Sequence, residues 1–198
     1  MSLQIIVARY NESIDWTAGF TNCIIYNKGE SECNTAHKVI ILPNVGREGH
    51  TFLHHIITNY DTLEEYTMFL QGFPFDHCPF LEKILMSDEW KRPFHMMTND
   101  VRHATIAYDE TCAKLPSHYN MVPTFNYIFN RNKNDHPFYF GPGAQMCVSR
   151  ETIRTRPKEF YKKIYDLLSH DANPLEGYML ERFWPMIFLG EGLESRAH

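Results

Sequence analysis

A lone acidic residue with an imidazole beside it follows one of the apolar runs of this 198-residue chain. The run Thr67–Leu70 ends at Gln71-Gly72, and Asp76 and His77 come shortly afterwards. Ligands of open parallel α/β sheets bind beyond the carboxyl ends of the strands, which is where such a loop would lie. A carboxylate there can supply a hard oxygen to Mg²⁺ or Mn²⁺. Asp76 is therefore a candidate metal ligand, with His77 as a second one, although an aspartate in this place can equally cap the next turn or helix.

Three earlier segments have the pattern of strands and also end in polar loops. They are Leu3–Ala8, Cys23–Tyr26 and Lys38–Leu42. The polar residues at the strand ends are Arg9, Tyr10, Asn11, Asn27, Lys28, Arg47 and Gln71. A stacking ring, amide groups and cations suit a nucleoside diphosphate held with a divalent cation, and a helix that begins near Arg47 would add N–H donors for phosphate. The alternative for Arg47 is an ordinary solvated arginine beside a helix start.

The order of elements in the first half predicts an α/β fold. Leu3–Ala8 is almost continuously apolar, which is typical of a central strand covered on both faces. A helical spacing of apolar residues follows from Phe52 to Tyr60, and Thr67–Leu70 is the fourth strand. Strands that alternate with helices in this way indicate a single domain with a mostly parallel, Rossmann-like sheet flanked by helices.

The second half gives a weaker pattern. Residues 146–148 fit a short strand, and Pro157 fits the first position of a helix. For the last helix we expect Asn173 as N-cap, Pro174 at the first position and Glu176 at the third, with Pro185 as its end. The stretches KRPFHMMTND and KLPSHYNMVPTF are expected to be surface connections.

Composition excludes several classes of protein. The net charge of −5 argues against a nucleic-acid partner, because that binding needs clustered Lys and Arg. Five cysteines without a CxxC pair indicate neither a disulfide framework nor a zinc ribbon. The chain shows no signal peptide and no apolar run long enough to span a membrane. We therefore expect a soluble, cytoplasmic protein, whose oligomeric state the sequence leaves open.

Six segments of the chain resemble a known family. They are VARYNE, IYNKG, LPNVGREGHTFLHHIITNYD, MFLQGFPFDH, GPGAQMCVSRETIRTRP and PLEGYMLERFWP. The family occurs in fungi and large algal viruses and includes a viral glycosyltransferase domain that modifies a capsid protein. The resemblance implies a GT-A-like fold, a UDP-sugar donor, Mn²⁺ or Mg²⁺, and a glycan or glycoprotein acceptor. It also implies a nucleotide-binding half at residues 1–80, an acceptor-side half at 81–198, and, for a viral protein, capsid glycosylation in the host cytoplasm.

The same resemblance implies roles for individual residues. Ala8–Glu12 would hold the nucleoside, Asn27 and Lys28 would lie at the second strand end, and Arg47 near the phosphates. Asp76 falls where GT-A enzymes place an Asp-x-Asp metal motif, but neither of its neighbours is acidic. On the acceptor side, Gly143, Ala144 and Gln145 would line the site, with Glu176 and Glu181 as catalytic carboxylates.

Alternatives remain for these carboxylates and for the function. Glu176 has a structural explanation as part of a helix cap. Glu181 lies on a largely aromatic helix face and needs a partner, either Arg182, Arg150 or a substrate hydroxyl. The thin metal motif also suits a non-catalytic module that binds nucleotides or glycans. A metal-dependent nucleotidyl- or phosphoryl-transferring enzyme would need a second acidic metal ligand.

Overall fold

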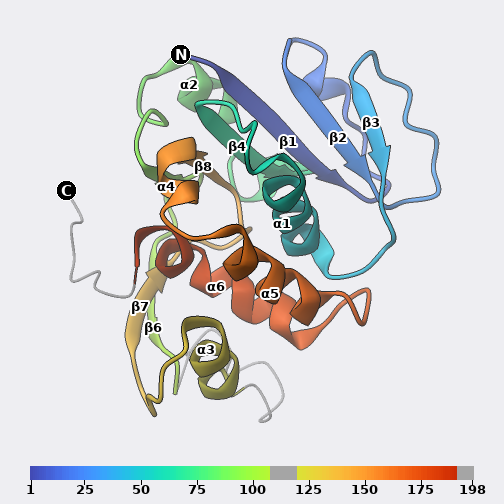
Figure 1. The fold of residues 1–198 in the computed structure, drawn as a ribbon. Coiled ribbons are helices and arrows are strands. Elements are labelled where there is room, and N and C mark those ends of the chain that lie inside the picture. The colour runs from blue at the N-terminus through green and yellow to red at the C-terminus, as the bar shows by residue number, and fades with distance from the viewer. Residues whose placement is uncertain (108–119, 191–198) are drawn as a thin grey trace.

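The computed structural model describes residues 1–107 and 120–190 as one α/β domain built on a six-stranded sheet (Figure 1). The strands of this sheet are β1 (Leu3–Arg9), β2 (Cys23–Asn27), β3 (Lys38–Ile41), β4 (Tyr66–Gln71), β5 (Phe94–Met96) and β8 (Met146–Ser149). They are arranged in the order β3-β2-β1-β4-β8-β5. The first four strands are parallel, and β8 runs antiparallel to both β4 and β5. The prediction of a mostly parallel sheet flanked by helices in a single domain is confirmed.

Helices cover the six-stranded sheet, and a separate two-stranded sheet lies beyond it. The helices are η1 (Asp15–Thr17), α1 (Arg47–Asn59), η2 (Pro74–Asp76), α2 (Leu81–Met86), α3 (Val122–Phe129), α4 (Arg150–Arg154), α5 (Lys158–Leu168) and α6 (Leu175–Leu189). Strands β6 (Arg102–Thr105) and β7 (Pro137–Phe140) pair separately, at the end of the molecule remote from β3 (Figure 1). Within the described residues, no helix is both long and apolar enough to cross a bilayer.

The continuous apolar run of β1 arises because both faces of the sheet are covered. Ile6 points into the larger core beneath α1, α5 and α6, which Figure 1 shows together on one face. Ile5 and Val7 point into a second core on the opposite face, with Leu81 of α2 and Met97. Successive strand residues alternate between faces, so a strand buried on both sides cannot show a polar-apolar alternation.

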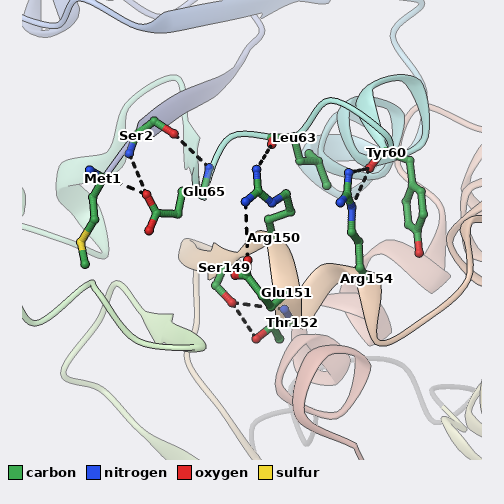
Figure 2. Close-up of polar contacts among 10 residues, drawn as sticks. All are labelled: Met1, Ser2, Tyr60, Leu63, Glu65, Ser149, Arg150, Glu151, Thr152 and Arg154. Atoms are coloured by element: carbon green, nitrogen blue, oxygen red, sulfur yellow. Dashed lines mark hydrogen bonds and ion pairs between the residues drawn. The ribbon is translucent and has the colours of Figure 1, made fainter.

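The antiparallel strand β8 is fastened to the loop that precedes β4 (Figure 2). Arg150, directly after β8, donates its backbone N–H to the carbonyl oxygen of Glu65 (2.9 Å) and a guanidinium N–H to that of Leu63 (3.3 Å). Arg154 donates two N–H groups to the carbonyl oxygen of Tyr60. The hydroxyl of Ser149 accepts the N–H of Thr152 and caps α4. These bonds fix the register of β8 against β4.

The structure contradicts the expectation that Pro185 ends the last helix. Helix α6 continues through Pro185 to Leu189. A proline inside a helix costs about 3 kcal/mol, whereas burial of one large apolar side chain contributes about 1.5–3 kcal/mol. The buried side chains on either side of this proline are Phe183, Trp184, Met186, Ile187 and Phe188. Their combined burial outweighs the proline, so the helix does not stop.

The two stretches predicted to be surface connections contain core elements. KRPFHMMTND includes β5, which pairs with β8, and the fully buried Met97. KLPSHYNMVPTF corresponds to residues 114–125, of which 114–119 lie outside the described residues. Its remainder includes Met121 and the start of α3, where Phe125 is fully buried. The prediction was wrong because pairing between distant segments decided these positions.

Two buried histidines of α1 are expected to make the fold sensitive to acid. Burial lowers the pKa of His50 and of His55 to about 3. An unfolded histidine binds a proton below about pH 6.5, so stability is lost as the pH falls below that value. Between pH 7 and pH 5 the expected loss is about 2 kcal/mol for each histidine.

Urea unfolding at the two pH values measures this loss. His50→Phe, which keeps a ring against Tyr165, should reduce the stability lost between pH 7 and pH 5 by about 2 kcal/mol. The exposed His103→Gln should leave it unchanged. Equal free energies of unfolding at pH 7 and pH 5 in the unaltered protein would contradict the assignment.

Candidate functional site

A cavity of about 410 Å³ lies at the carboxyl ends of the parallel strands. Register places Ala8 of β1 beside Gln71 of β4 and Arg9 beside Asn27 of β2, so the strand ends are level. The chain runs outward from β1 to β3 and returns to β4 on the other side of β1, and at such a switch point ligands bind. The lining residues that the sequence predicted are Ala8, Arg9, Tyr10, Lys28, Arg47, Gln71 and Asp76.

Arg9 organises the loops around the cavity. Its side chain is only 5% exposed, and its guanidinium donates to Asn27 Oδ1, Ser31 Oγ and the carbonyl oxygens of Glu12, Ser31 and Glu32. These bonds use all five guanidinium N–H donors. Arg9 therefore joins the loop after β1 to the loop after β2. Its positive charge lies at the cavity wall, but it has no N–H donor left for a ligand.

Asn27 and Asn11 also serve these loops. The Oδ1 of Asn27 accepts from Arg9, and its amide group bonds in both directions with the backbone of Gly29. Asn11 is exposed, and its Oδ1 accepts the N–H of Ser31. A Cβ at Gly29 would collide with the carbonyl of Tyr10, so glycine is required where the two loops cross. The structure thus uses both asparagines to position Tyr10, whose ring is half exposed at the cavity.

Lys28 and Arg47 place two cations on the cavity wall. The Lys28 ammonium donates to the carbonyl oxygens of Val45 and Arg47, both at 2.5 Å. Burial lowers the pKa of Lys28 to about 8, and the charge of Glu48 opposes this shift. The Arg47 guanidinium lies 4.2 Å from the ring centroid of Tyr178 and donates to Asn173 Oδ1 at 3.3 Å. Helix α6 and its preceding loop therefore hold Arg47 in place.

The backbone at the start of α1 differs from the expectation. Gly46 and Arg47 both have left-handed φ angles of 64° and 51°. Their N–H groups donate to the carbonyl oxygens of Asp171 and Ala172, so these two donors are not available to a phosphate. A non-glycine residue in this conformation stores strain, which is often found at ligand sites. Anion binding here would rely on the two side-chain cations rather than on these N–H groups.

Asp76 and His77 face different cavities although they are adjacent in sequence. Asp76 is exposed at the end of η2 and lines the strand-end cavity. His77 lines a separate cavity, and its ring lies so close to Gly143 that a Cβ there would be 2.5 Å from its Cγ. Gly143 also has a φ of 92°, so both its backbone conformation and its contact with His77 require glycine.

The donor set of the strand-end cavity suits a cation held mainly by phosphate. Through residues 1–107 and 120–190, no group of three or more His, Cys, Asp or Glu could hold a metal ion. Mg²⁺ commonly takes only one or two carboxylates and completes its shell with phosphates and water. Asp76 fits that pattern, because it is exposed in a cavity that Lys28 and Arg47 also line. His77 does not share the cavity.

Two acidic residues of the cavity were not predicted as individual site residues, although Glu12 belongs to the Ala8–Glu12 segment that was expected to hold the nucleoside. Glu12 accepts the N–H of Tyr10 at 2.7 Å, and a Cβ at Gly72 would collide with its carboxylate. Glu48, in the first turn of α1, has an Oε2 3.6 Å from Arg47 Nε. Burial raises the pKa of Glu48, and Arg47 opposes that shift. In the sequence, Glu12 could have been identified as a site residue from its place in the same strand-end loop as Tyr10. Glu48 could have been identified from its position directly after Arg47.

The residues that were expected on the acceptor side lie in the buried loop between β7 and β8 and do not form an open surface. Ala144 and Gln145 are 4% and 3% exposed. Gln145 donates to the carbonyl oxygen of Pro74 at 2.9 Å, and Gly143 donates its N–H to Glu181 Oε1 at 2.7 Å. This loop is thereby tied both to η2 and to α6.

The two glutamates of α6 have different surroundings. Glu181 Oε2 lies 4.0 Å from Arg182, and its charge also acts on Arg47 and Glu48. Its partners are thus the N–H of Gly143 and Arg182, not Arg150. Glu176 lies 3.8 Å from His170. The predicted cap is wrong by one residue, because Pro174 occupies the N-cap position and no side chain caps α6.

Over residues 5–83 and 76–197, the chain matches the family described as "Protein of unknown function (DUF3431)". The two ranges together include nearly every residue. The chain belongs to the DUF3431 family. No curated protein and no solved structure matches it.

Lys28 gives this family member a testable pH dependence. Its pKa of about 8 means that the amine loses its proton as the pH rises through 8, whereas at pH 7 it is an ammonium. If the cavity binds diphosphate, the affinity for UDP with Mg²⁺ should be level near pH 7 and fall above pH 8, by up to about tenfold per pH unit. Calorimetric titration with UDP and Mg²⁺ from pH 7 to pH 9.5 measures this affinity.

The matched control is Lys28→Met, which should bind UDP weakly at every pH and with a flat profile. A variant with the same fall in affinity above pH 8 as the unaltered protein would show that another group titrates.

Proposed function

We propose that this protein is a metal-dependent glycosyltransferase of GT-A-like fold, which moves sugar from a UDP-sugar to a hydroxyl of a glycan or glycoprotein. The observation that carries the proposal is the strand-end cavity, where Tyr10, Lys28, Arg47 and Asp76 meet. The cavity volume of about 410 Å³ lies within the usual range for small-molecule sites. The resemblance of the six sequence segments supports a sugar nucleotide as the particular ligand.

Each of the four residues has a role suited to a nucleoside diphosphate. The half-exposed ring of Tyr10 offers a face to the base. Lys28 and Arg47 pair with the two phosphates, and Asp76 contributes an oxygen ligand to the cation. When bound, the cation would neutralise charge that develops on the departing diphosphate. Arg9 keeps the Tyr10 loop in place through its five hydrogen bonds.

The reaction breaks the bond between the anomeric carbon and the diphosphate oxygen and forms one to the acceptor oxygen. UDP departs with the bonding electrons, and the acceptor hydroxyl loses its proton. Glu181 is the better placed of the two glutamates to act near that hydroxyl, because its carboxylate contacts Gly143 and influences Arg47. Glu176, paired with His170, is a weaker candidate.

A non-catalytic module that binds a nucleotide or glycan is the second candidate. One observation favours it: Asp76 is not part of a metal-ligating group of three or more His, Cys, Asp or Glu anywhere in residues 1–107 and 120–190. Such a module would bind UDP without turning over a UDP-sugar. The same observation weakens a nucleotidyl- or phosphoryl-transferring enzyme, which needs a second acidic ligand.

A panel of UDP-sugars with Mn²⁺ separates these functions. A transferase is expected to release UDP from one donor of the panel, by transfer to added saccharides or by slow hydrolysis. A binding module would bind UDP but release none. If neither UDP nor any UDP-sugar binds, both proposals for the strand-end cavity are wrong.

A further inference from the structure

A second cavity, of about 620 Å³, has in its wall His77, the residue that follows Asp76 of the strand-end cavity. It lies between α2 and the segment that runs from β5 to Asp100. Asp76 lines one cavity and His77 the other, so a single step along the chain separates their walls. The loop between β7 and β8 holds the segment around Asp76 and His77 in place, because Gly143 packs against the ring of His77 and Gln145 donates a hydrogen bond to the carbonyl oxygen of Pro74.

The lining of this second cavity combines an exposed aromatic ring with hydrogen-bonding groups. Phe80, at the start of α2, is 52% exposed, and the Lys83 ammonium lies 5.1 Å from its ring centroid. His95 and Asn99 add an imidazole and an amide to the wall. Asp100 contributes a carboxylate whose Oδ2 accepts both Nε–H and Nη2–H of Arg102, at 3.0 and 2.5 Å. A pyranose presents a face of C–H groups to an aromatic ring and hydroxyls to such polar groups.

This cavity has fewer cations in its lining than the strand-end cavity, where Arg9, Lys28 and Arg47 lie with three carboxylates. Its charged side chains are one cation, Lys83, and two carboxylates, Glu89 and Asp100. Burial and nearby Arg92 lower the pKa of His95, which therefore adds no positive charge at pH 7. A lining with a single cation, Lys83, is poorly suited to a phosphate and better suited to a neutral polar ligand.

We propose that the cavity between α2 and β5 binds the saccharide acceptor, with Phe80 as its stacking platform and Asp100 as a hydroxyl partner. The inference rests on the proposed glycosyltransferase function, because only a transferase has an acceptor. It also moves the acceptor surface away from Ala144 and Gln145, whose side chains are buried and tied to neighbouring loops. A sugar in this cavity would meet the donor at the Asp76–His77 step.

Methionine methyl signals provide a direct test, because Met96 and Met97 line the cavity. The full chain is labelled with ¹³C at its methionine methyls and titrated with methyl glycosides of glucose, galactose, mannose and xylose, without nucleotide. At least one glycoside is expected to shift the Met96 and Met97 signals but not that of Met179, which packs in the other core. Phe80→Ala should weaken this binding about tenfold, because it removes the ring on which the sugar stacks.

Met86→Ala is the matched control, since Met86 lies on the same helix, is 89% exposed and does not line the cavity. It should bind the glycoside as the unaltered protein does. The inference is overturned if no glycoside shifts Met96 or Met97, or if Phe80→Ala leaves the affinity unchanged. UDP binding, measured on the same sample by calorimetry, keeps the two proposals distinct. UDP binding without glycoside binding overturns the acceptor site alone, whereas glycoside binding without UDP binding overturns the transferase and leaves a saccharide site.

Discussion

Asp76→Ala is expected to abolish the metal-dependent part of UDP binding while leaving the fold intact. Asp76 is exposed and ends a short helix, so its loss removes little packing. In the strand-end cavity it is the acidic residue that follows β4, next to the point between β1 and β4 where the strand order reverses. A cation bound by one protein carboxylate and a diphosphate loses its only anchor to the chain. We expect the affinity for UDP with Mn²⁺ to fall by at least about 100-fold, close to the affinity without metal.

Calorimetric titration of UDP with and without Mn²⁺ measures this effect. Glu82→Gln is the control, because Glu82 is an exposed carboxylate in the first turn of α2 and lines neither cavity. It should keep full Mn²⁺ dependence. Asp76→Ala with undiminished Mn²⁺-dependent affinity would remove this carboxylate from the site.

Arg9→Lys is expected to destabilise the whole domain as well as the cavity. Lysine has three donors on a flexible stem and cannot reproduce the planar fork that bonds both strand-end loops. The carbonyl oxygens of Ser31 and Glu32 and the Oδ1 of Asn27 would lose donors in a nearly buried setting. Each buried acceptor left unpaired costs about 1–3 kcal/mol, so we expect a loss of about 3 kcal/mol or more in the free energy of unfolding.

Urea denaturation checks this prediction against Arg92→Lys, an exposed arginine outside the cavity. That control should change stability by less than about 0.5 kcal/mol. UDP affinity of Arg9→Lys should also fall, because the Tyr10 loop loses its support. A stable Arg9→Lys protein with normal UDP binding would show that the five hydrogen bonds do not organise the loops.

The central sheet was predictable because its strands carry local signals. The apolar runs of β1, β2 and β4 end in polar loops, and parallel pairing then brings those loops to one edge. That reasoning correctly placed Tyr10, Lys28, Arg47 and Asp76 around one cavity. Their ligand stays a prediction, as do the roles of residues 1–80 and 81–198 as donor and acceptor halves.

The remaining features depend on contacts between distant segments. The position of β5 follows from pairing with β8, whose residues come 50 or more positions later in the chain, and no local pattern indicates this pairing. Glu181 accepts a hydrogen bond from the backbone N–H of Gly143, and the sequence cannot indicate which backbone N–H will be a side chain's partner. The separation of Asp76 from His77 results from the turn of η2, whereas sequence adjacency suggested a shared metal. Local patterns thus predicted the location of the cavity, but not which side chains support it and which remain available.

A crystal structure with UDP and Mn²⁺ tests the central claim most directly, because manganese can be located by its anomalous scattering. The account predicts an anomalous peak in direct coordination with the Asp76 carboxylate and the diphosphate, with Lys28 and Arg47 beside the phosphates and the base against Tyr10. A peak elsewhere, or an Asp76 side chain that points into solvent away from bound nucleotide, would contradict it.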